Sequence, residues 1–73
     1  MFNQALALAR ESYSEERNGE LGRLIAVSRQ VVSGINYRMI FITDDGEFEV
    51  TVYIQPWTDT KEVLDMKPLT VRD

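Results

Sequence analysis

Two short segments of this 73-residue chain place apolar side chains where turns are expected. The first is Gln30-Val31-Val32-Ser33-Gly34, in which two valines precede a small residue and a glycine. The second is Pro56-Trp57, a residue that stiffens the backbone followed by the only tryptophan. Valine and tryptophan side chains offer hydrophobic burial against a partner and no group for acid-base catalysis. These segments therefore indicate binding to a partner through apolar contacts, and not catalysis.

The remaining polar residues form no catalytic set. The chain has no cysteine and no histidine, which removes the thiolate nucleophile, the commonest general base and the commonest metal ligand. Two adjacent acids, Asp44 and Asp45, lack the further oxygen ligands of a calcium site, so we interpret them as part of a turn. Glu11, Glu15 and Glu16 indicate a solvated helix face. We expect no enzyme, no catalytic residue, no metal and no cofactor.

Charge and hydropathy exclude two classes of partner. The net charge is −4 and the eight basic residues are scattered, so we expect no nucleic-acid partner. No run approaches the roughly 20 apolar residues of a membrane span, and we expect no membrane association. The first residues lack the basic and apolar regions of a signal peptide. A cytoplasmic location is expected, or secretion if a signal peptide has been removed from a precursor.

The first part of the chain predicts one α-helix from residue 2 to about residue 17. Apolar residues recur there at steps of three and four, which lays one stripe along a helix. The stripe consists of Phe2, Ala5, Leu6, Ala9 and Tyr13. Leu8 and Tyr13 could instead contact a partner, but helical spacing favours the core.

After the helix the apolar period changes to two, which predicts four antiparallel strands. The inward positions of the two clearest strands are Ile35, Tyr37, Met39 and Phe41, and Phe48, Val50, Val52 and Ile54. A weaker strand is expected between residues 22 and 30, and a fourth near residues 61–66. Asp44-Asp45-Gly46 predicts a hairpin between the two clear strands. We therefore expect a single α+β domain over residues 1–73, with a four-stranded antiparallel sheet wrapped around the helix.

This order of strands predicts that the two apolar segments lie together. In an antiparallel meander, the turn at Gln30–Gly34 and the turn at Pro56-Trp57 fall at one end of the sheet, and Asp44-Asp45-Gly46 falls at the other. Each segment taken alone has another interpretation, in which the valines continue the strands and Trp57 folds over the sheet end. Taken together they indicate an exposed apolar wedge for a partner.

The two segments resemble the paired motifs of the cystatin family of cysteine-protease inhibitors. The family has Gln-x-Val-x-Gly in one hairpin loop and Pro-Trp in another, and the flanking Ile35-Asn36-Tyr37 and residues 52–55 also look like its strands. Because the chain has no cysteine, it is most similar to the disulfide-free stefins and plant cystatins. The resemblance implies a cystatin-like fold. The family's first strand, with its N-terminal glycine segment, is expected to be missing here.

The resemblance also implies a function and its residues. The chain would be a reversible, competitive inhibitor of papain-like cysteine proteases, which occludes the active-site cleft with two loops. Carried over by position, the protease-binding residues would be Gln30, Val31, Val32, Ser33, Gly34, Pro56 and Trp57. The alternative is a cystatin-fold binding module, or an engineered or domain-swapped variant, with weak or no inhibition. Exchange of the helix and first strand between two chains would give a homodimer and open the Gln30–Gly34 loop.

Overall fold

The computed structural model describes residues 2–17, 19–44 and 46–69, which form one helix, four strands and a short 3₁₀ turn. The elements in chain order are α1 (Phe2–Glu16), β1 (Leu24–Val32), β2 (Gly34–Thr43), β3 (Gly46–Gln55), η1 (Pro56–Thr58) and β4 (Thr60–Pro68). An N-terminal helix followed by a four-stranded antiparallel sheet is the α+β fold expected from the resemblance.

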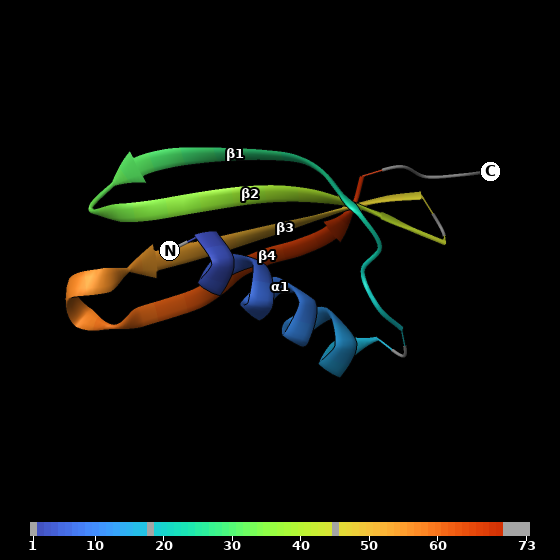
Figure 1. Cartoon of the computed structure of the whole chain (residues 1–73), viewed down its shortest axis with the longest axis horizontal. Coiled ribbons are helices and arrows are strands. Elements are labelled where there is room, and N and C mark those ends of the chain that lie inside the picture. Colours follow the sequence, from blue (N-terminus) through green and yellow to red (C-terminus); the bar gives the residue numbers. More distant parts are fainter. Residues whose placement is uncertain (1, 18, 45, 70–73) are drawn as a thin grey trace.

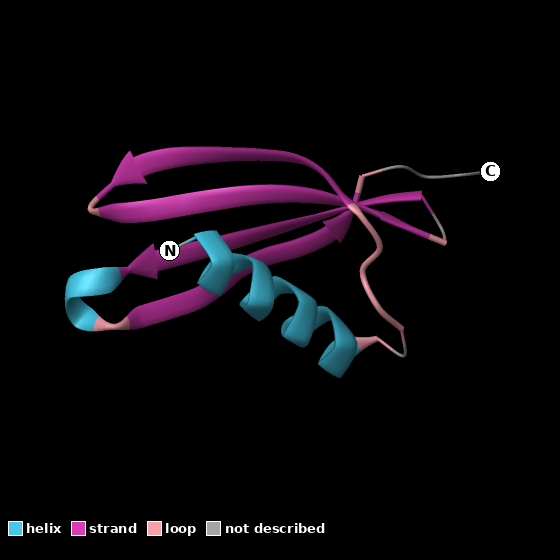
Figure 2. Cartoon of the chain, viewed as in Figure 1, coloured by secondary structure: helices cyan, strands magenta, loops and turns pink. Residues whose placement is uncertain are grey.

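The sheet is a meander in which each strand pairs with the next along the chain, in the order β1-β2-β3-β4. Figure 1 shows α1 lying across one face of the sheet, and Figure 2 distinguishes this helix from the short turn η1 between β3 and β4. The helix packs mainly over β3 and β4, so β1 lies at the edge farthest from it. The first and last strands are both edge strands.

The helix is held by the apolar stripe that its sequence predicts. Small residues at the centre of the stripe, Ala5 and Ala9, are fully buried and allow the helix to approach the sheet closely. Aromatic pairs fix its two ends, because the Phe2 ring lies 5.7 Å from the Tyr37 ring and the Tyr13 ring lies 5.0 Å from the Phe48 ring. Leu8 also packs against the core. Among the described residues no helix is long and apolar enough to cross a membrane.

The core is supplied largely by the two central strands. All the inward positions predicted for β3 are buried, and so are three of those predicted for β2, with Ile35 half-buried. The buried side chains of the two strands are Tyr37, Met39, Phe41, Phe48, Val50, Val52 and Ile54. The edge strands contribute only half-buried side chains to the core. Most of their side chains therefore remain accessible to a partner.

One expectation for the outer face is wrong. The alternation of β3 predicts that Glu49 points into water, but it is only 5% exposed. Arg38 on β2 is paired with Thr51 and reaches Glu49 diagonally. Its Nη2 donates to Glu49 Oε2 at 2.9 Å, and its Nε lies 2.9 Å from Glu49 Oε1. The hydrogen bond from Arg38 lowers the pKa of Glu49 below its usual value of 4.5, although burial acts in the opposite direction. The ion pair between the two strands therefore offsets the free-energy cost of burying this carboxylate.

This pair predicts a pH-dependent stability. Because the folded-state pKa of Glu49 is depressed, its contribution is present above pH 4.5 and is lost as the pH falls through the folded-state value. We expect the difference in melting temperature between the native chain and Glu49→Gln to shrink from about pH 6 to about pH 3. Glu47→Gln, at an exposed position of the same strand, controls for the loss of one carboxylate. A difference that is constant with pH would contradict the assignment.

Candidate protein-binding site

The two apolar segments predicted to bind a partner lie at the same end of the sheet. The turn between β1 and β2 and the turn η1 both stand at that end, and the β2–β3 hairpin stands at the other (Figure 1). The paired Thr43 and Gly46 flank the hairpin, while Asp45 lies outside the described residues. The expected placement of the two turns is confirmed. We call residues 30–34 the first tip and residues 56–59 the second tip.

The first tip is not the open loop that the sequence predicts. Gln30, Val31 and Val32 are the last residues of β1, and β2 begins at Gly34, so only Ser33 lies between the strands. Val32 and Gly34 are paired across this turn. The valines continue the strand because their branched side chains favour an extended backbone. The first tip is therefore a strand end closed by one residue.

Gly34 is required by this tight turn. Its φ of +138° is a conformation that side-chain-bearing residues rarely adopt. A Cβ atom at Gly34 would also lie 2.5 Å from Tyr53 Oη and 2.6 Å from Tyr53 Cε1. The glycine is buried and has no side chain, so its contribution to the site is to close the turn.

The valines of the first tip are exposed, although they point to opposite sides. Val31 is 73% exposed and Val32 is 48% exposed. Successive strand residues alternate between faces, so Val31 lies on the helix side with its paired residue Ile35, and Val32 lies on the outer side. Gln30 and Ser33 are exposed as well. A partner that contacts both valines must therefore contact both faces of the strand end.

The second tip presents Trp57 to solvent. Pro56 begins a single 3₁₀ turn, and Asp59 ends it in the left-handed region at φ 54°, with its N–H donating to the Pro56 carbonyl at 3.2 Å. Trp57 is 67% exposed. The interpretation in which this side chain covers the sheet end is therefore wrong. A rigid turn holds a large apolar side chain in water, which is typical of a binding site.

Hydrogen bonds join the two tips. The Ser33 carbonyl oxygen accepts from Tyr53 Oη and from Gln55 Nε2, the latter at 3.0 Å. Thr58 Oγ1 donates to Gln55 Oε1 at 2.8 Å and also lies 2.8 Å from Thr60 Oγ1. Because a hydroxyl has one proton, Thr60 is then the donor to Thr58. A chain of polar contacts thus runs from the first tip through the end of β3 to the second.

The sequence prediction missed Tyr53, Gln55 and Thr58 as members of this site. The alternation of β3 places Tyr53 on the outer face, and Gln55 is considered only among residues 52–55, which resemble a strand of the family. The signal that could have found them is register: Ile54 pairs with Ile35, so its neighbours stand beside the turn at Ser33. Among the described residues, no group of three or more possible ligand side chains could hold a metal ion.

No family model matches the chain, but the chain is similar to a known protein. The relative is cysteine proteinase inhibitor 8 of Oryza sativa subsp. japonica, which is 35% identical over 51 residues. The match covers 63% of this chain and 42% of that protein, so it spans less than half of the relative's length.

The tight first tip predicts that Gly34 is intolerant of any side chain. Gly34→Ala adds both a strained φ and a clash with the Tyr53 ring, and we expect it to lower the free energy of unfolding by about 1–3 kcal/mol or more. Gly19→Ala is the matched control, because a Cβ there meets nothing within 4 Å. Denaturant titration of both variants measures the difference, and equal effects would contradict the geometry.

Proposed function

We propose that the chain belongs to the cystatin family and is a reversible, competitive inhibitor of papain-like cysteine proteases. The observation that carries the proposal is the placement of Val31, Val32 and Trp57 as exposed apolar groups at one end of the sheet. The name of the rice relative supports the class of target, and the fold supports the way in which the site is presented.

The proposed binding energy comes mainly from Trp57. Complete burial of an aromatic side chain removes about 150–250 Å² from water at roughly 25 cal/mol per Å². Since Trp57 is 67% exposed in the free chain, binding would gain roughly 2–4 kcal/mol from this residue before association costs are subtracted. Val31 and Val32 add smaller apolar areas beside it.

The remaining site residues have supporting parts in this proposal. Gln30 and Ser33 offer polar groups at the rim of the first tip, and Gly34 closes its turn. Pro56 begins the turn that holds Trp57 away from the sheet. Rigid tips lose little conformational freedom on binding, which favours affinity.

Inhibition would occur by occlusion. The two tips enter the active-site cleft and exclude substrate, and no peptide bond is presented to the catalytic thiolate of the protease. No residue of this chain takes part in bond formation or cleavage. Binding is therefore reversible, and inhibition is competitive with substrate.

The proposal predicts that Trp57→Ala weakens inhibition and leaves the fold intact. We expect the inhibition constant against papain to rise at least about tenfold, because the variant removes the largest apolar contact. Ile42→Ala is the control, since Ile42 is an exposed apolar residue at the opposite end of β2. Far-ultraviolet circular dichroism verifies both folds. If verified monomer of the native chain does not inhibit papain, the proposed function is wrong and a binding module for another partner is favoured.

Domain swapping also stays a prediction. The segment to be exchanged, α1 with β1, precedes Ser33, and Val31 and Val32 are already extended, so only the turn at Ser33 and Gly34 has to open. A swapped dimer would lose the first tip, and we expect it not to inhibit. Size-exclusion chromatography with light scattering, followed by inhibition assays on each peak, measures this. Full activity in a swapped dimer would contradict the role of the first tip.

A further inference from the structure

The two edge strands of the sheet differ in their protection against pairing with another chain. β4 carries four charged residues, a terminal proline and a bulge, which all hinder pairing with another strand. In contrast, β1 carries one charged residue, Arg29, and no proline, and its irregularity is confined to its start between Leu24 and Ala26. An edge that is extended, apolar and rich in β-branched residues is a template for strand addition.

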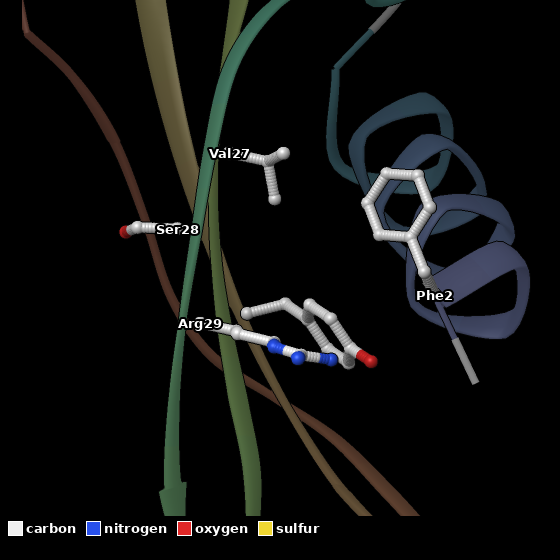
Figure 3. Close-up of a pocket in the computed structure, with 5 residues that line it drawn as sticks. Phe2, Val27, Ser28 and Arg29 are labelled. Atoms are coloured by element: carbon white, nitrogen blue, oxygen red, sulfur yellow. The ribbon is translucent and has the colours of Figure 1, made fainter.

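The helix side of β1 is open as well. Because α1 packs mainly over β3 and β4, Val27 stays 48% exposed on the helix side of β1. A groove of about 340 Å³ separates β1 from the start of the helix, lined by Phe2, Val27, Ser28, Arg29 and Tyr37. In the close-up, Val27 points from the strand toward Phe2, while Ser28 points to the other side of the strand (Figure 3). The start of the helix therefore leaves Val27 only partly covered.

The ladder between β1 and β2 identifies the backbone groups that face outward. Ile42 directs both its N–H and its C=O toward the segment before β1, to Arg23 and Gly22. Hydrogen-bonding pairs alternate along an antiparallel ladder, so Ala26, Ser28 and Gln30 bond to β2 through the residues paired with them. The residues between them, Val27, Arg29 and Val31, direct their N–H and C=O groups away from the sheet.

We propose that β1 pairs in antiparallel fashion with β1 of a second copy of this chain, about a two-fold axis at Ser28. In this register Val27 lies opposite Arg29 of the second copy, and both residues have outward-facing backbone groups that can exchange hydrogen bonds. The register overlaps the full length of the strand. It joins two four-stranded sheets into one continuous sheet and places Ile25 beside Val31 of the second copy.

Overlap and charge select this register over its two neighbours, because an axis at Val27 would leave Val31 and Val32 outside the new ladder. An axis at Arg29 would also match outward-facing groups, but it would set the two guanidinium groups directly opposite each other, which is destabilising. With the axis at Ser28, the only charged residue of β1 faces a valine. The charge pattern of the strand is therefore self-complementary in the register that pairs it completely.

This dimer is distinct from a swapped one, and it does not depend on protease inhibition. Both chains keep α1 and β1 on their own sheets, and the turn at Ser33 stays closed. Edge pairing requires no unfolding, so we expect rapid equilibrium on dilution. A contact confined to one strand edge is small, and small interfaces are characteristic of weak assemblies, so we expect a dissociation constant above about 1 µM.

Sedimentation velocity over a range of concentrations up to about 1 mM tests the proposal. The native chain is expected to show a reversible monomer–dimer equilibrium. Val27→Lys places a lysine opposite Arg29 of the second copy, twice by symmetry, and we expect the dissociation constant to rise at least about tenfold. Val27→Lys combined with Arg29→Glu restores an attractive pair and is expected to restore the dimer.

Leu64→Lys is the matched control, because it adds the same charge at an exposed position on the other edge strand, and we expect no effect on the dimer. Circular dichroism verifies that each variant is folded. A native chain that is monomeric throughout, a Val27→Lys variant that dimerises as well as the native chain, or a double variant that stays monomeric would each overturn the proposal.

Discussion

The acceptance of two side-chain hydrogen bonds by the Ser33 carbonyl is the interaction on which the candidate site depends. Tyr53 and Gln55, at the end of a central strand, hold the turn between the first two strands beside the turn that carries Trp57. Gly34 makes this possible, because any side chain there would displace the Tyr53 ring. The two tips therefore act as one structural unit, although they are formed by different pairs of strands.

The apolar groups of the tips are exposed because other residues fill the core. Ala5 and Ala9 of the helix and the inward residues of β2 and β3 fill the interior, and the edge strands contribute little to it. Trp57 and Val31 can consequently stay in water in the free chain. Among the described residues, the same division leaves the outer edge of β1 unpaired, and we infer that a second copy binds along this edge.

Periodicity was sufficient to predict the helix, the order of the strands and the end of the sheet at which the two motifs meet. It left open whether Val31 and Val32 belong to the turn or to β1, because strand ends depend on pairing with β2 as well as on local propensity. Nor could it predict the burial of Glu49, which depends on Arg38 lying diagonally opposite on the neighbouring strand. Side-chain contacts between strands cannot be predicted from the apolar pattern of one strand, because they depend on the register of the pair.

The central claim is that one end of the sheet, held together at Ser33, binds the protease. Amide hydrogen exchange of the chain with and without papain whose catalytic thiol has been blocked tests it most directly. We expect protection on binding at Val31, Val32, Ser33 and Trp57, with little change at Thr43 and Gly46 of the opposite hairpin. Protection at that hairpin, with none at the tips, would contradict the account.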